Sequence, residues 1–279
     1  YSWTFTTSAA PDTTPPTVTI SAPSAPLAGA MGGVSFTVSY NEAGTYGLDP
    51  SFVILNKTGS AGGTVSVSGG TTANPVVTVG GVSGDGTLGI TISSGAMSDA
   101  AGNPSLASFP SATFVVDSTP PAISIGTIST SNPSPGWARA GDTVTVPFTV
   151  IDAGSGVAGI PWVSVGGTAA TVTGTFPNYN AVYTFTAGDA EGPVSLYISA
   201  QDAAGNTGAS SPPSGVVLDL TAPFVTIGPP DRMYAKSGTV VTCTVTYTGA
   251  DTVTLDPMNV ILTVGGTAVV SGPTVSGSG

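Results

Sequence analysis

The chain of 279 residues has no histidine, one cysteine and only four basic residues. Without histidine it can form neither a Ser-His-Asp nor a Cys-His catalytic arrangement, and it has no imidazole for a metal site. The single cysteine, Cys243, excludes an internal disulfide. A pair of carboxylates could still hydrolyse a glycosidic bond, but the acidic residues fall in turns and linkers. We therefore expect no enzyme activity and no catalytic residues.

Charged residues are few and mostly of one sign. Fifteen are acidic, and the formal net charge is −11. Such a surface repels phosphate backbones, so we expect no nucleic-acid partner, and cations are the natural ligands. No apolar run approaches the ~20 residues of a membrane helix, so we expect no membrane span in this segment. The 39 glycines, 24 prolines and 40% hydrophobic residues instead indicate a folded chain with many turns.

Three similar stretches divide the chain. DTTPPTVTI begins at Asp12, DSTPPAISI at Asp117 and DLTAPFVTI at Asp219, so the spacings are 117 − 12 = 105 and 219 − 117 = 102 residues. A period near 100 is the size of a small domain with its own core, whereas solenoid units repeat every ~20 to 50 residues. We expect the last strand of a preceding domain plus a linker over 1–11, domains over 12–116 and 117–218, and an incomplete domain over 219–279.

Apolar and polar residues alternate with a period of two almost everywhere, as in half-buried strands. Residues 143–150 read TVTVPFTV, and no stretch has a helical period of 3.6. Within 117–218 we expect seven strands, at 122–129, 143–151, 160–165, 169–173, 181–186, 194–200 and 215–218. About seven short antiparallel strands in each ~100 residues predict an all-β chain of tandem immunoglobulin-like β-sandwiches.

Two unusual side chains are expected in the cores of these sandwiches. VTCTVTY at 241–247 corresponds to VSFTVSY at 34–40, so Cys243 takes the place of Phe36 and is predicted to be a small core residue. Trp162 lies on a predicted strand and is expected in the core, as in immunoglobulin folds. The alternative for Trp162 is an exposed ring that contacts a ligand.

The starts DTTPP, DSTPP and DLTAP, together with SDAAGNPS at 98–105 and QDAAGNTG at 201–208, resemble bacterial Ig-like repeat domains. Members of that family are strung in tandem in very large adhesins and other secreted or cell-surface proteins. The resemblance therefore implies an extracellular or bacterial cell-surface location. It also implies that the modules serve mostly as stalks and spacers, with adhesion often confined to other domains of the polypeptide.

The DAAGN stretches have two possible roles. Asp can accept hydrogen bonds from the turn while Gly takes a left-handed conformation, so a simple turn accounts for the motif. Alternatively, the motif supplies a calcium ligand, because in such a sandwich the loops after the second and sixth strands lie at the same pole as the domain start. Ca²⁺ at the domain junctions would then be held by one group of carboxylates in each domain: Asp12, Glu42 and Asp99; and Asp117, Asp152 and Asp202.

These features favour a structural stalk or filament segment of a large bacterial extracellular protein, which would space or support adhesion. Its partners would be neighbouring Ig-like domains of the same polypeptide, and other copies in a filament or a surface ligand are further possibilities. The alternatives are a glycan- or protein-binding module and the spacer domains of a secreted glycan-degrading enzyme. Exposed aromatics clustered at one pole of a domain would favour binding, whereas aromatics confined to the sandwich would favour the stalk. The alternating stretch Tyr1–Thr7 is expected to be a strand, and in a self-assembling filament it would pair with a neighbouring subunit.

Overall fold

The computed structural model describes residues 1, 10–42, 44–250, 253–265, 267 and 269–276. It contains two compact units, residues 1–218 and 219–279, and each is described by itself. The helices among the described residues are two 3₁₀ turns of three residues each. Within this part of the chain, no helix has the length and apolar character needed to cross a bilayer. The expected strand at Tyr1–Thr7 falls on residues 2–9, which lie outside the described residues.

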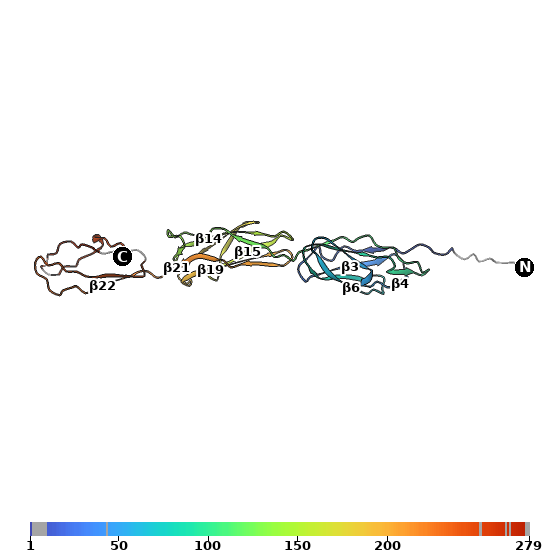
Figure 1. Ribbon diagram of the computed structural model, residues 1–279, viewed down its shortest axis with the longest axis horizontal. Helices are drawn as coiled ribbons and strands as arrows, with labels where there is room; N and C mark the ends of the chain where they lie inside the picture. Colours follow the sequence, from blue (N-terminus) through green and yellow to red (C-terminus); the bar gives the residue numbers. More distant parts are fainter. Residues whose placement is uncertain (2–9, 43, 251–252, 266, 268, 277–279) are drawn as a thin grey trace. The chain divides into compact units, whose positions relative to one another are not determined.

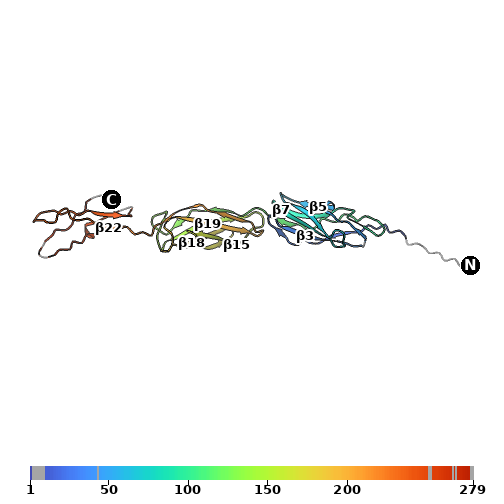
Figure 2. The same cartoon turned by 90° about the horizontal axis from the view of Figure 1, so that it is seen from below.

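Residues 18–116 of the first unit form a β-sandwich, here the first sandwich (Figures 1 and 2). Its elements are β1 (Val18–Ile20), β2 (Leu27–Ala28), β3 (Gly33–Tyr40), β4 (Gly44–Tyr46), η1 (Pro50–Phe52), β5 (Val53–Lys57), β6 (Gly62–Ser68), β7 (Val76–Ser83), β8 (Gly86–Ile92), β9 (Met97–Asp99) and β10 (Phe114–Val116). One sheet has the order β1-β3-β7-β6 and the other β2-β10-β8-β5, while β4 pairs with β9.

The first sandwich has one core, which both sheets supply. On β3, alternate residues Val34, Phe36 and Val38 are buried, as the period of two predicts. Leu88 and Phe114 face them from the other sheet, and the rings of Phe36 and Phe114 are 6.2 Å apart. Two antiparallel-rich sheets that share one apolar layer are an immunoglobulin-like β-sandwich.

Residues 122–218 form the second sandwich. Its strands are β11 (Ala122–Ile125), β12 (Ser129–Thr130), β13 (Trp137–Ala138), β14 (Thr143–Ile151), β15 (Val157–Val165), β16 (Thr168–Ala169), β17 (Thr171–Thr175), β18 (Asn178–Thr184), β19 (Gly192–Asp202), β20 (Thr207–Ser210) and β21 (Pro213–Leu218). One sheet has the order β11-β14-β18-β17, with β12 also on β14. The other has the order β13-β21-β19-β15-β16, with β20 also on β19. Figure 1 shows β14 in one layer and β15, β19 and β21 in the other.

The seven strands expected in 117–218 correspond to strands of the second sandwich, but the structure has eleven strands there, and the expected strand at 169–173 is divided between β16 and β17. The expected strand at 122–129 is divided into β11 and the two-residue β12. Neither β13 nor β20 was expected. β13 has only two residues and is defined by its parallel pairing with β21, and β20 is defined by its pairing with β19. Such short strands depend on their partners rather than on a local alternation.

Trp162 is not in the core, so that prediction is wrong. On β15, Val163 and Val165 are buried, whereas Trp162 is 50% exposed. Three residues, 159–161, lie between the pairs Ala158↔Gln201 and Trp162↔Ser199, opposite the single residue Ala200. This bulge sets the register of the rest of β15. Because neighbouring side chains on a strand point to opposite faces, the register that places Val163 in the core places Trp162 on the outer face.

The C-terminal unit, residues 219–279, has two paired strands, β22 (Phe224–Ile227) and β23 (Val245–Thr248), and the 3₁₀ turn η2 (Pro257–Asn259). η2 begins after Asp256, whose side chain accepts from the N–H of Met258, just as Asp49 accepts from Ser51 before η1. This equivalence agrees with the matching sequences TLDPMNVIL and GLDPSFVIL.

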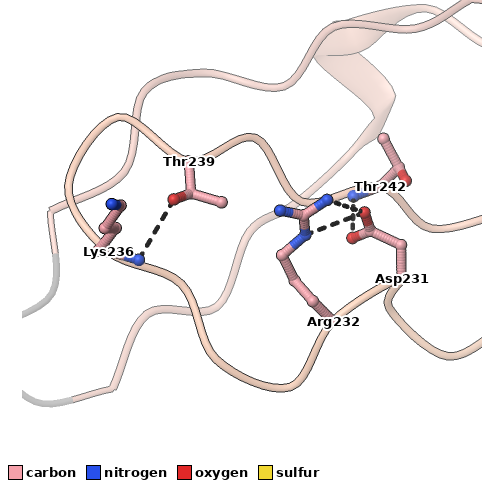
Figure 3. A network of polar contacts seen from close by, with 5 residues as sticks. All are labelled: Asp231, Arg232, Lys236, Thr239 and Thr242. Carbon is pink, nitrogen blue, oxygen red and sulfur yellow. Dashed lines mark hydrogen bonds and ion pairs between the residues drawn. The ribbon is translucent and has the colours of Figure 1, made fainter.

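Cys243 is exposed in the C-terminal unit, so its predicted burial is wrong. No described residue of this unit is buried, because its two-stranded sheet has no facing sheet within the unit. Polar contacts instead hold the loop between the strands (Figure 3). Arg232 forms an ion pair with Asp231 at 2.8 Å, and Asp231 also accepts from the N–H of Thr242 at 3.0 Å.

Candidate metal centres

The carboxylates of Asp117, Asp152 and Asp202 meet at one end of the second sandwich. Each follows or ends a strand: Asp117 comes after β10, Asp152 comes after β14, and Asp202 is the last residue of β19. One carboxylate oxygen from each lies within 4.8 Å of the others. Asp117 and Asp202 are 0% and 1% exposed. The structure thus brings together the three acidic side chains that the sequence places at this pole.

Backbone N–H groups hold these carboxylates in place. Asp117 accepts from the N–H of Thr119 at 3.1 Å and from that of Ser155 at 2.6 Å. Asp152 uses Oδ2 to accept from Gly154 at 3.2 Å and from Gly156 at 2.6 Å. Backbone N–H groups of one short loop, residues 152–156, therefore hold the carboxylates of both Asp117 and Asp152 and preorganise the cluster.

One oxygen of the cluster has no hydrogen-bond partner. Oδ1 of Asp152 is buried and accepts no hydrogen bond in the structure, although buried polar atoms are nearly always paired. The loop beside it is also tightly packed, because a Cβ added to Gly154 would collide with the carboxylate of Asp117. A buried carboxylate oxygen without a partner, on a residue grouped with two further carboxylates, is available to bind a cation.

The first sandwich has a matching cluster of Asp12, Glu42 and Asp99, whose ligand atoms also lie within 4.8 Å of one another. Asp12 precedes β1, Glu42 follows β3 and Asp99 ends β9. Asp99 is buried, whereas Asp12 is exposed and Glu42 is half-buried. The two clusters therefore use the same three positions in the repeat, and the first is more open to solvent.

The pKa of Asp99 is held below its ordinary value. The main cause is the hydrogen bond from the side chain of Asn103, supported by backbone N–H groups of the DAAGN turn, while desolvation opposes the effect. A hydrogen bond donated to a carboxylate favours its ionised form. Asp99 is thus stabilised as an anion by the turn itself.

The asparagine that ends each DAAGN motif is the residue that sequence analysis overlooked. Asn206 donates through Nδ2 to Asp202 at 2.7 Å and to the main-chain carbonyl of Asp117 at 3.0 Å. Asn103 makes the same two bonds, to Asp99 at 2.8 Å and to the carbonyl of Asp12 at 3.0 Å. The sequence signal that could have identified this asparagine is its presence at the last position of both DAAGN motifs, 99–103 and 202–206. Each asparagine ties the turn to the start of its own sandwich.

Asp85, in the loop between β7 and β8, is a second residue that sequence analysis missed. It accepts from the N–H of Ser118 at 2.8 Å and from the hydroxyl of Thr119 at 2.6 Å. These two bonds lower the pKa of its carboxyl group, the Thr119 hydroxyl having the larger effect. Asp85 thereby fixes the two residues that directly follow the ligand Asp117.

No family model matches this chain, and no curated protein matches its sequence. Among solved structures, fibronectin(III)-like modules of CbhA from Clostridium thermocellum are 16% identical, with 73% of this chain and 93% of theirs covered and a TM-score of 0.32. An adhesin described as Ca²⁺-stabilised, which helps an Antarctic bacterium bind ice, is 21% identical, with 79% of this chain covered and a TM-score of 0.45. This chain spans about half, 53%, of that adhesin chain.

The Ig1-2 module of the Drosophila receptor protein tyrosine phosphatase DLAR is a third similar structure. It is 11% identical, with 75% of this chain and all of the module covered, and the TM-score is 0.22. All three similarities are too distant to assign a ligand or an activity. In each sandwich, the strand order and the single core between its two sheets are those of an immunoglobulin-like fold. The chain is therefore an all-β protein of tandem immunoglobulin-like sandwiches.

Proposed function

We propose that this chain is a structural segment, a stalk or filament portion, of a large bacterial extracellular or cell-surface protein. In this proposal its domains are residues 12–116, 117–218 and 219–279. In this proposal the chain has no catalytic role. It spaces or supports adhesion by other parts of the polypeptide, and it uses Ca²⁺ to fix the domain starts at Asp12 and Asp117.

The observation that carries this proposal is the repetition of one carboxylate arrangement. Two segments whose domain-start aspartates are 105 residues apart (117 − 12) each gather three acidic side chains from the same repeat positions. In each, an asparagine bridges the turn and the domain start. A site built from the domain start and two loops of the same sandwich acts on the joint, where a spacer protein needs stiffness. A substrate cleft would not have to recur at each joint.

The residues fit Ca²⁺ well. The ligand atoms are hard carboxylate oxygens, which Ca²⁺ prefers, and Asp152 has an oxygen that no protein group satisfies. Within the second cluster, each pair of carboxylates at this separation repels by roughly 1 to 4 kcal/mol, depending on the local dielectric. A bound Ca²⁺ would neutralise this repulsion. It would also join three segments that are distant in sequence: the domain start, the loop after β14 and the turn after β19.

Calorimetry of the whole chain tests the metal. In Ca²⁺ at 100 times its dissociation constant, the folded state should gain about 2.7 kcal/mol relative to chelator. For a domain of ~100 residues this corresponds to a rise in Tm of about 10 to 20 °C. Mg²⁺ at the same concentration should have a much smaller effect, because it requires a tighter octahedral site. Identical melting curves in Ca²⁺ and chelator would refute the metal-dependent joint.

A further inference from the structure

The outer face of the second sandwich carries a pair of exposed aromatic rings. Trp162 on β15 and Tyr197 on β19 have ring centroids 5.7 Å apart and an interplanar angle of 60°. They are 50% and 39% exposed, and Ile160 beside them is 72% exposed. Burial of aromatic side chains is favourable, so a pair that is exposed and held in place by mutual contact is typical of a binding surface.

The register of the sheet explains this surface. On β19 the residues alternate strictly, with Leu196, Ile198 and Ala200 inward and Ser195, Tyr197 and Ser199 toward the outer face. Trp162 pairs with Ser199 and is therefore on the same face. The bulge at 159–161 ends the regular pairing there and leaves Ile160 exposed.

A third ring extends the same face. Trp137 on β13 pairs with Val217, and Val217 pairs with Pro193 on β19. Pro193 precedes Tyr197 by four residues and Ser199, the partner of Trp162, by six, so Trp137 lies about 13 Å along the strand direction from Tyr197 and about 20 Å from Trp162. Trp137 is 42% exposed. Two aromatic positions at this spacing suit an extended ligand rather than a small one.

The charges around this surface determine the kind of ligand. The sheet positions on this face are uncharged, with Ser195, Ser199, Gln201 and Thr207 beside the rings. Residues 117–218 as a whole contain six acidic residues and one basic residue, Arg139, so an anionic ligand would be repelled. A cationic ligand would need a carboxylate beside the Trp162–Tyr197 pair, and the carboxylate that continues this side of β19, Glu191, precedes Tyr197 by six residues, about 20 Å along the strand. What remains is an uncharged ligand with both apolar and hydroxyl groups.

We propose that this face, Trp162, Tyr197, Ile160 and Trp137, binds a neutral polysaccharide. The C–H faces of pyranose rings would pack on the aromatic rings, and the hydroxyl and amide side chains between them would hydrogen-bond to sugar hydroxyls. This binding role goes beyond the proposed stalk and uses none of its metal ligands. The described residues of β5 in the first sandwich form no such aromatic pair, since the corresponding outward positions are Ile54 and Asn56, and Asn56 is bonded to Thr91.

The test is affinity electrophoresis of the whole chain in gels that contain one soluble polysaccharide each. The neutral probes are a mixed-linkage β-glucan, a galactomannan, a xylan without acidic substituents and dextran, and the acidic probe is polygalacturonate. At least one neutral polymer should retard the protein, and polygalacturonate should not. Trp162→Ala and Tyr197→Ala should each weaken retardation at least about tenfold, which corresponds to about 1.4 kcal/mol. Trp162→Tyr should retain most of it.

Matched controls separate binding from folding. Phe109→Ala removes another exposed ring, 92% exposed, from the first sandwich and should leave retardation unchanged. The Trp162 variants should melt at the temperature of the unchanged protein. Retardation by none of the neutral polymers, equal retardation by polygalacturonate, or unchanged retardation of Trp162→Ala would each overturn the proposal. So would a dimer in sedimentation that Trp162→Ala abolishes, because the face would then bind a second copy.

Discussion

Replacing Asp152 with asparagine should abolish the stabilisation of the second sandwich by Ca²⁺ and should stabilise its metal-free form. Asp152 contributes the one buried carboxylate oxygen without a partner, and its other oxygen accepts from Gly154 and Gly156. Asn has the same shape, so its carbonyl oxygen can keep the two loop bonds. Its NH₂ group then takes the position of the unpartnered oxygen, on a residue grouped with Asp117 and Asp202.

The magnitude follows from the charges. The substitution removes two of the three like-charge pairs of the cluster. With water-like screening each pair costs about 1 kcal/mol, so the metal-free variant should gain about 2 kcal/mol. For a domain of ~100 residues this raises the Tm by roughly 8 to 16 °C in chelator. In saturating Ca²⁺ the variant should lose the stabilisation of about 2.7 kcal/mol that the original protein obtains from the ion.

The assay is thermal unfolding of Asp152→Asn and the original protein, each in chelator and in Ca²⁺. The original protein should be more stable in Ca²⁺, and the variant should be the more stable of the two in chelator. Asp142→Asn is a matched control in the same sandwich. Asp142 accepts from Asn132 and from the N–H of Arg139 outside the cluster, so its replacement should destabilise the protein equally in both buffers.

A variant that is less stable than the original protein in chelator would show that the Asp152 charge serves the loop rather than an ion. A variant that keeps the full Ca²⁺ response would show that the ion binds elsewhere. Either result would refute the reasoning from the unpartnered oxygen.

Two further predictions concern hydrogen bonds of the second sandwich. Asn206→Ala should lower the unfolding free energy by about 1 to 3 kcal/mol in urea titrations, because Asp202 and the carbonyl of Asp117 both lose its amide; an unchanged midpoint would contradict this role. Hydrogen bonds lower the pKa of Asp142, chiefly from Asn132, and of Asp189, chiefly from the N–H of Thr186. The stabilisation by these hydrogen bonds should be complete above the unfolded pKa of about 3.9 and should be lost as the pH falls through the lower folded pKa values. The denaturant concentration at the unfolding midpoint should therefore be constant from pH 5 to 7 and should decrease when the pH is lowered below 4.

The class of fold could be predicted because the inward positions repeat every second residue. TVTVPFTV at 143–150 specifies β14 with its inward face, and the structure agrees. The position of Trp162 could not be predicted in this way, since a bulge at 159–161 separates it from the regular pairing before it. A local alternation does not reveal where a bulge resets the register.

The acidic residues of the candidate site could be predicted because they occupy loop positions that an immunoglobulin topology brings to one pole. The roles of Asn103 and Asn206 could not, because an amide that bridges a turn to a domain start depends on the fold. The exposure of Cys243 has a different cause. Its alternating sequence matches β3, but Cys243 lies two residues before β23, and the described residues of its unit form no second sheet that could cover it. Burial is a property of the assembled sandwich and not of the strand alone.

The parallel pairing of one short early strand with the last strand affects how each sandwich resists mechanical load. β2 pairs in parallel with β10, and β13 pairs in parallel with β21. When tension pulls the two ends of a sandwich apart, parallel strands slide along each other. The hydrogen bonds between them are then loaded together in shear, whereas an antiparallel terminal hairpin would open one bond at a time. Each of these two-residue strands therefore acts as a mechanical clamp in series with its neighbours along a pulled chain.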